Sequence, residues 1–152
     1  MTAATVGFTV RSYFSMIDSG QLDRQGHFAA PGYRLHFAGL PQPLDLAGAA
    51  QLIGGIRAAF PDLRHHIRQI NEHDGRIAVQ IRATGTQQGD FQGVPASGRP
   101  IAVPSTHTFR FDGNLIAEHW IEVEMTEIMR QISGDDVSLL MQLGAMPAPQ
   151  PA

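Results

Sequence analysis

Apolar and polar side chains alternate over most of the second half of this sequence. A period of two is typical of β-strands that bury one face, because successive side chains of a strand point to opposite sides. Two turn sequences, His73-Asp74-Gly75 and Asp112-Gly113-Asn114, separate such stretches and are typical of β-hairpins. The alternating stretches, which we predict to be strands, are residues 65–69, 77–83, 101–111 and 115–123.

The rest of the sequence shows the spacing of amphipathic helices. The first apolar stripe is followed by Gly20 and the second by Pro61, both residues that end helices. Between them, a Pro31-Gly32 turn precedes a short predicted strand, Tyr33–Phe37, and residues 39–43 predict a loop. The three stripes are Val6, Val10, Tyr13, Phe14 and Ile17; Leu46, Ala49, Leu52, Ile53, Ile56 and Phe60; and, after the last strand, Met125, Ile128, Met129 and Ile132.

Helices followed by hairpin-connected strands predict an α+β fold. A strongly curved antiparallel sheet wrapped around the N-terminal helices would form a cone with an interior pocket. The 152 residues suffice for one domain with a substantial core. We assign residues 1–144 to this domain, with Val137, Leu140 and Leu143 continuing the last helix. We expect the Pro- and Ala-rich residues 145–152 to be disordered.

Composition excludes several classes of protein. Hydrophobic residues make up 43% of the chain and the net charge is −3, which argues against a disordered chain and against a nucleic-acid-binding protein with a basic surface. No apolar run approaches the roughly 18 residues of a membrane span, and the N-terminal residues lack the pattern of a signal peptide. Without cysteine there is neither a disulfide nor a thiol nucleophile. We therefore expect a cytoplasmic protein that binds neither nucleic acid nor membranes.

Five segments carry a resemblance to a known family. They are residues 33–40, 56–63 (IRAAFPDL), 85–95 (GTQQGDFQGVP), 108–113 (TFRFDG) and 118–120 (EHW). In this order, over roughly residues 5–133, the chain resembles the SnoaL-like polyketide cyclases of the nuclear transport factor 2-like superfamily. The resemblance implies a cone-shaped α+β barrel, a homodimer, and a cofactor-free pocket between sheet and helices that takes a small-molecule polyketide intermediate.

The resemblance also implies where acid–base residues should lie. In the aldol-forming cyclases of this family, an Asp on the last strand is the acid–base residue and a His on the preceding strand supports it. The supporting His corresponds to His107. The Asp position, directly after Trp120, is occupied by Ile121, which can neither accept nor donate a proton. The mechanism of the family therefore does not transfer intact.

Strand alternation points to a second histidine. His107 shares a strand face with Val103 and Phe109, and His119 shares one with Ile121, so both imidazoles should face the interior and lie close across one hairpin. Burial and mutual repulsion would keep them neutral. Such a pair suits a general base or a hydrogen-bond donor to an enolate. The alternative is that each His only satisfies a buried backbone or Tyr group.

Other side chains are candidates for the pocket. Tyr13 would point its hydroxyl inward or serve as a core aromatic, and His36 would lie at the pocket rim or on the surface. His65 shares its face with Ile67, so it is expected inside. The apolar residues expected to contact the substrate are Phe60, Phe91, Phe109, Ile121 and Met125.

Three further expectations concern a dimer contact, a replacement for the missing Asp, and a metal ion. Trp120 should lie on the outer face and contact the second subunit. Glu122 or Glu124 would replace the missing Asp only if the strand is bulged. The seven histidines show none of the spacings of known metal sites, so we expect no metal.

The sequence thus leaves three classes of function. The first is a cofactor-free cyclase of polyketide (antibiotic or other secondary-metabolite) biosynthesis, acting either by His-assisted aldol chemistry or by shape-driven intramolecular cycloaddition, which Ile121 favours because it makes the pocket more apolar. The second is an epoxide hydrolase or isomerase, which ordinarily needs two carboxylates. The third is a non-catalytic, ligand-binding dimer module.

Overall fold

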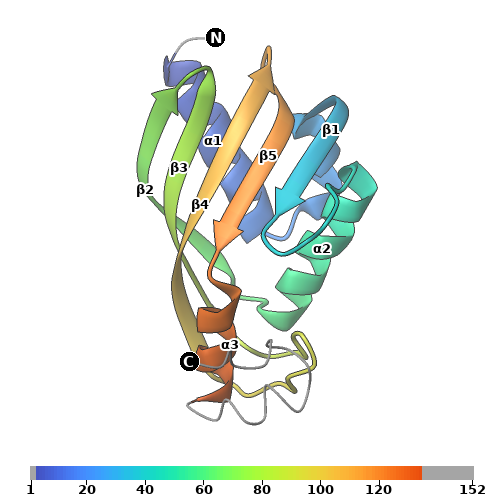
Figure 1. Ribbon diagram of the computed structural model, residues 1–152, viewed down its shortest axis with the longest axis vertical. Coiled ribbons are helices and arrows are strands. Elements are labelled where there is room, and N and C mark those ends of the chain that lie inside the picture. The colour runs from blue at the N-terminus through green and yellow to red at the C-terminus, as the bar shows by residue number, and fades with distance from the viewer. Residues whose placement is uncertain (1–2, 135–152) are drawn as a thin grey trace, which may run out of the picture.

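The computed structural model describes residues 3–134 and contains a five-stranded sheet with α1 and α2 on one of its faces (Figure 1). Every helix and strand expected from the sequence is present. The predicted helix extension past Val137, the domain boundary at residue 144 and the disordered tail lie outside the described residues. In chain order the elements are α1 (Ala3–Asp18), the 3₁₀ helix η1 (Leu22–Phe28), β1 (Ala29–Phe37), α2 (Leu46–Ala59), β2 (Arg64–His73), β3 (Arg76–Thr86), β4 (Pro100–Asp112), β5 (Leu115–Val123) and α3 (Met125–Ser133).

The sheet has the order β1-β5-β4-β3-β2, and β2 to β5 form consecutive antiparallel pairs. Asp74 and Gly75 join β2 to β3 with φ values of 53° and 74°, the left-handed conformation that a tight two-residue hairpin requires. Gly113 opens the next two-residue turn with φ of 61°. The predicted α+β fold with a curved sheet is therefore confirmed.

The predicted sheet was wrong in one respect, because β1 pairs parallel to β5. A hairpin turn makes two consecutive strands antiparallel. No hairpin joins β1 to β5, because α2 and three strands lie between them in the sequence, so local sequence does not determine the direction of β1. The strand also begins at Ala29, earlier than predicted. The Pro31-Gly32 pair lies within it, where pairing with β5 is interrupted between Ala29 and Arg34. No element is predicted from the sequence where η1 lies.

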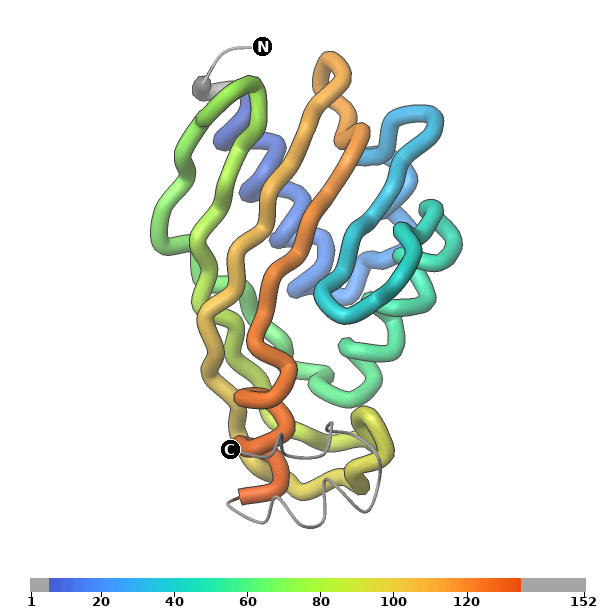
Figure 2. Tube along the Cα trace, viewed as in Figure 1, coloured from blue at the N-terminus to red at the C-terminus, as the bar shows by residue number. Residues whose placement is uncertain are grey.

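The loop between β3 and β4 closes one end of the molecule, where it folds back toward α2 (Figure 2). The amides of Gln88 and Gly89 donate to the carbonyl of Ala59 at the end of α2, at 2.8 and 3.2 Å. A Cβ atom at Gly89 would lie 2.7 Å from the Ala58 carbonyl oxygen, so this close approach needs glycine. The fully buried Gln87 donates to the carbonyl of Val94 at 2.9 Å. These bonds hold the loop in place beside the core.

The helices of the described residues are too short or too polar to cross a membrane.

Candidate active site

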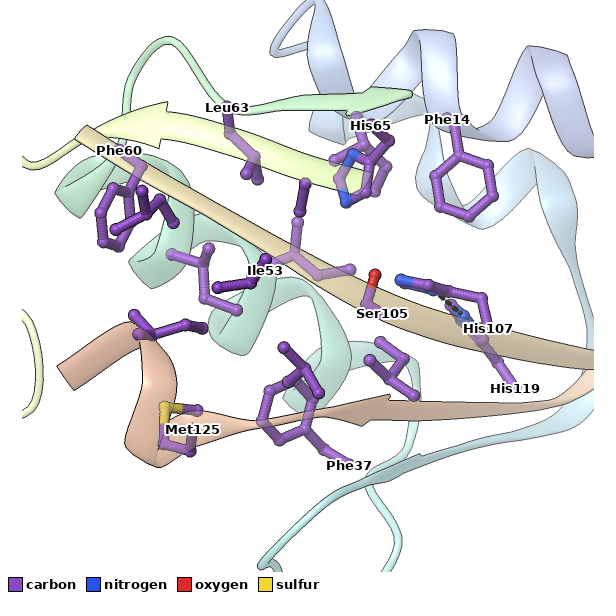
Figure 3. A pocket seen from close by; sticks show the side chains of 18 of the residues that line it. Phe14, Phe37, Ile53, Phe60, Leu63, His65, Ser105, His107, His119 and Met125 are labelled. Atoms are coloured by element: carbon purple, nitrogen blue, oxygen red, sulfur yellow. Dashed lines mark hydrogen bonds between the residues drawn. The ribbon is translucent and has the colours of Figure 1, made fainter. Parts of the chain in front are cut away.

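A cavity of about 100 Å³ lies between the concave face of the sheet and the helices (Figure 3). Its walls come from α1, α2, α3 and all five strands, and most of the side chains are apolar. Polar groups gather at one end, where His65, Ser105, His107 and His119 lie near Phe14, and the opposite end beside Phe60 and Met125 is apolar (Figure 3). The cavity thus has a polar end and an apolar remainder.

A groove of about 300 Å³ lies next to the apolar end of this cavity. Phe37, Ile56, Phe91 and Met125 line both spaces. The cavity and the groove therefore adjoin at these four side chains.

His107 and His119 face the cavity, as strand alternation predicts. The β4–β5 register pairs His107 with Ile121 and Phe109 with His119, so the two imidazoles are diagonal neighbours. His107 Nδ1 and His119 Nε2 lie 2.8 Å apart, within hydrogen-bond distance, and both residues are buried. The Tyr13 hydroxyl lies 3.4 Å from His119 Nδ1 and continues the chain of polar groups.

Burial keeps these three hydrogen-bonded side chains uncharged. It lowers the pKa of His107 well below the usual 6.5, and repulsion from His119 and His65 lowers it further. Burial likewise lowers the pKa of His119, to about 3. The pKa of the Tyr13 hydroxyl is raised well above 10 by the same loss of solvent. At neutral pH the two imidazoles therefore share a hydrogen bond as neutral rings, and one nitrogen of His107 points into the cavity (Figure 3).

His65 lies inside, as predicted, but its partner Asp18 was missed. The last residue of α1, Asp18, accepts two hydrogen bonds from His65: Oδ1 lies 2.6 Å from Nδ1, and Oδ2 lies 2.8 Å from the backbone nitrogen. Both side chains are nearly buried, with exposed fractions of 14% for Asp18 and 11% for His65. The sequence placed Asp18 only at a helix end, because nothing local shows that α1 packs its C-terminus against the start of β2.

Ser105 is a second residue that sequence reasoning missed. Its side chain lines the cavity and is 7% exposed. Within the described residues its Oγ has no hydrogen-bond partner. Two positions before His107 on the same strand face, it could have been found by extending the alternation that placed His107.

Most of the predicted site residues line the cavity. For these residues the functional roles remain predictions. The residues are Tyr13, Phe60, His65, Phe91, His107, His119, Ile121 and Met125.

Two residues predicted to bind the substrate, His36 and Phe109, do not line the cavity, and of the two positions left open for His36 the structure shows the one on the surface. His36 lies on the outer face of the sheet, where it stacks on Trp120 and bonds Glu118 at 2.8 Å. Its neighbours Leu35 and Phe37 point inward, so alternation turns His36 outward. Phe109 is completely buried but does not line the cavity. Its ring stacks against His119 at a centroid distance of 4.2 Å and therefore helps to fix the orientation of this imidazole.

Neither carboxylate proposed as a replacement for the missing Asp reaches the cavity. Glu122 and Glu124 are exposed, and the β4–β5 register is regular from Glu118 to Val123. The bulge lies elsewhere, between Arg110 and Phe111. Over residues 3–134, no three His, Asp or Glu side chains are grouped so that they could hold a metal ion.

Comparison with known proteins gives a consistent result. The family model described as SnoaL-like polyketide cyclase matches residues 8–132. A crystal structure from Jannaschia sp. CCS1, provisionally assigned as a SnoaL-like polyketide cyclase, has 25% identity and a TM-score of 0.78, covering 86% of this chain and 93% of that one. IdmH from Streptomyces antibioticus, provisionally assigned as a polyketide cyclase, has 24% identity and a TM-score of 0.75, with coverages of 84% and 97%.

A third structure, AclR from Streptomyces galilaeus, provisionally assigned as a hydroxylase, has 23% identity and a TM-score of 0.75 over 96% of this chain and 100% of that one. No curated protein matches the sequence.

Proposed function

Because this chain belongs to the SnoaL-like polyketide cyclase family, we propose that it closes a carbon ring on a largely apolar polyketide-type intermediate of secondary metabolism, using its own side chains. The observation that carries the proposal is the division of the cavity into an apolar body and one polar end. An apolar chain with a few carbonyl groups fits such a site.

Shape and polarity would each contribute to ring closure. Holding the two reacting carbons together saves roughly 7–11 kcal/mol of barrier in well-oriented intramolecular reactions. A shape-driven cycloaddition needs nothing more, whereas aldol closure also needs proton transfer and stabilisation of an oxyanion. The neutral His107–His119 pair, Tyr13 and the buried hydroxyl of Ser105 support the His-assisted aldol version, because a purely shape-driven reaction has no use for them.

The other two classes of function receive less support. Epoxide opening ordinarily uses two carboxylates, and within residues 3–134 no Asp or Glu lines the cavity. Asp18 bonds His65 but does not itself line the cavity. A non-catalytic binding module accounts for the apolar body of the cavity but gives no role to a histidine held by a carboxylate at the polar end.

Deletion of the gene in its source organism tests the cyclase proposal. We expect the final metabolite to disappear and an isomer of the same mass, or a precursor heavier by one water, to accumulate, since aldol closure keeps all atoms and subsequent dehydration loses one water. High-resolution mass spectrometry of extracts would measure this. A precursor lighter by one water would indicate epoxide hydrolysis, and an unchanged metabolite profile would contradict an enzymatic role in biosynthesis.

We also propose that the protein forms a homodimer through the outer face of the sheet. Trp120 lies there half-buried, with the guanidinium of Arg76 4.5 Å from its ring centroid and His36 stacked against it. Trp120→Glu would place a carboxylate in the interface, so we expect sedimentation velocity to show a shift from dimer to monomer. His73→Gln, an exposed change at the end of β2, should leave the sedimentation coefficient unaltered. A monomeric unmodified protein would refute this proposal.

A further inference from the structure

We infer that His65, held by Asp18, is the general base of this cavity, and that Ser105 and His107 bind the substrate oxygen that becomes negatively charged. The inference rests on the proposed function and narrows it to acid–base ring closure. It also names the substrate class, a compound with a carbonyl group whose neighbouring carbon carries an acidic proton. The base would then lie on β2, held by a carboxylate at the end of α1, and not on the last strand, β5.

The Asp18 carboxylate fixes which nitrogen of His65 is free. An ionised carboxylate only accepts hydrogen bonds, so Nδ1 must carry the proton that it shares with Oδ1 at 2.6 Å. In the neutral ring, the lone pair then resides on Nε2. The second bond, from the backbone nitrogen of His65 to Oδ2 at 2.8 Å, prevents the carboxylate from rotating away. Asp18 is thus a positioning residue, which orients the imidazole and stabilises its cation once it has taken a proton.

His65 differs in this respect from the other two imidazoles of the cavity. The polar partners of His107 and His119 are one another and Tyr13, none of which carries a negative charge. Burial without a carboxylate lowers the pKa of both, so they are poor proton acceptors. The rings of His65 and His107 are nearly perpendicular, with centroids 5.7 Å apart. One reacting group can therefore contact the base and a hydrogen-bond donor together.

Ser105 supplies the place for the substrate oxygen. A buried hydroxyl without a hydrogen-bond partner destabilises the folded protein, so it is unusual unless a ligand satisfies it. The Oγ of Ser105 is buried and unpaired among the described residues, and it lies near His65 and His107 at the polar end of the cavity (Figure 3). A carbonyl oxygen placed here would accept from Ser105, and from His107 when His107 Nε2 carries the proton of the neutral pair.

The proposed step is balanced in atoms and electrons. His65 Nε2 takes a proton from the carbon next to the carbonyl, the electron pair of that C–H bond forms the C=C bond of an enolate, and the π pair of the C=O bond moves onto the oxygen. The enolate carbon attacks a second carbonyl carbon of the same molecule and forms the new C–C bond. The second oxygen takes the proton back from His65, so the product is an isomer with a new hydroxyl group.

Complementation of the deletion strain tests the base. We expect the ratio of cyclised product to precursor to fall roughly 100-fold with His65→Gln, and roughly tenfold with either Asp18→Asn or Ser105→Ala, each of which removes one hydrogen-bonding group or its charge. His66→Gln is the matched control, because this neighbouring histidine is exposed on the outer face, where its ring bonds the Thr84 hydroxyl at 3.0 Å. Immunoblots and thermal unfolding would verify that each variant is present and folded.

A full product ratio with His65→Gln would overturn this inference while leaving the cyclase proposal intact. An unaltered profile of the deletion strain would instead overturn the cyclase proposal, and with it the substrate class inferred here. The two failures are therefore distinguishable.

A measurement on purified protein tests the base without knowledge of the substrate. The probe is 5-nitrobenzisoxazole, an apolar carbon acid whose ring opens when a base removes one proton. We expect the unmodified protein to accelerate the opening and His65→Gln to lose at least tenfold of that acceleration, with His66→Gln unchanged. Absence of acceleration, or equal acceleration by His65→Gln, would overturn the assignment of His65 as base.

The positioning role of Asp18 can be tested by the tautomer of the His65 ring. Nitrogen-15 NMR distinguishes a protonated from an unprotonated imidazole nitrogen, so His65 should show a protonated Nδ1 in the unmodified protein and a mixture of both tautomers in Asp18→Asn. Asp23→Asn, an exposed acidic residue of η1, is the control. If the His65 tautomer is the same in Asp18→Asn, Asp18 does not position the base.

Discussion

Between pH 7 and pH 5 the free energy of unfolding should fall by about 4 kcal/mol, because two buried imidazoles must stay neutral in the folded protein. Burial lowers the pKa of His107 and His119 far below roughly 6.5, their value in the unfolded chain. In this pH range the unfolded state therefore binds more protons than the folded state, and acid favours unfolding. Each imidazole contributes about 1.4 kcal/mol for every pH unit below its unfolded pKa.

Chemical denaturation at several pH values would measure this slope. His119→Gln removes one of the two buried imidazoles, so the slope should fall to about half, whatever the variant does to absolute stability. His73→Gln removes a histidine side chain that is 86% exposed and solvated in both states, and should leave the slope as it is. A stability that is constant from pH 7 to pH 5 would mean that the imidazole pair is hydrated or charged in the folded protein.

Ile121→Asp should destabilise the protein by about 3 kcal/mol or more at pH 7, because it buries a carboxylate in an apolar cavity. Ile121 is 9% exposed, lines the cavity and is paired with His107 across the β4–β5 ladder. Side chains in such a pair are adjacent. The introduced carboxylate should therefore raise the pKa of His107, since an opposite charge favours the cation.

Ile121→Asn is the matched control, since it removes the same apolar volume and adds no charge. Denaturation should show Ile121→Asp less stable than Ile121→Asn at pH 8, with the difference shrinking as the pH falls and His107 becomes protonated. Proton NMR of the His107 ring should show titration between pH 8 and pH 5 in Ile121→Asp but not in the unmodified protein. Equal stability of the two variants at every pH would mean that water reaches the carboxylate freely.

The alternation of apolar and polar residues predicts on which side of the sheet a side chain lies, because this depends only on the strand that carries the residue. Alternation put His107 and His119 inside, and the hairpin turn put them on neighbouring strands, where they lie 2.8 Å apart. Alternation also turned Trp120 outward. Applied to β1 in the same way, it would have placed His36 outside, between the inward-facing Leu35 and Phe37.

Some features depend on how distant elements pack and therefore leave no local pattern. Phe109 was expected to touch the substrate because it faces inward, yet Tyr13 and His119 cover it. Facing the interior and lining a cavity are different properties, because only the packing of the helices decides which inward side chains remain uncovered.

By itself, the sequence determined the α+β class, the hairpin order of β2 to β5 and the inward direction of the paired histidines. These follow from backbone geometry over a few residues, where successive side chains must alternate and a Gly turn must reverse the chain. Only the tertiary structure decided that β1 lies parallel to β5 and that Asp18 meets His65. Both contacts join segments far apart in the chain, and their geometry depends on how α1 and β1 pack against the finished sheet.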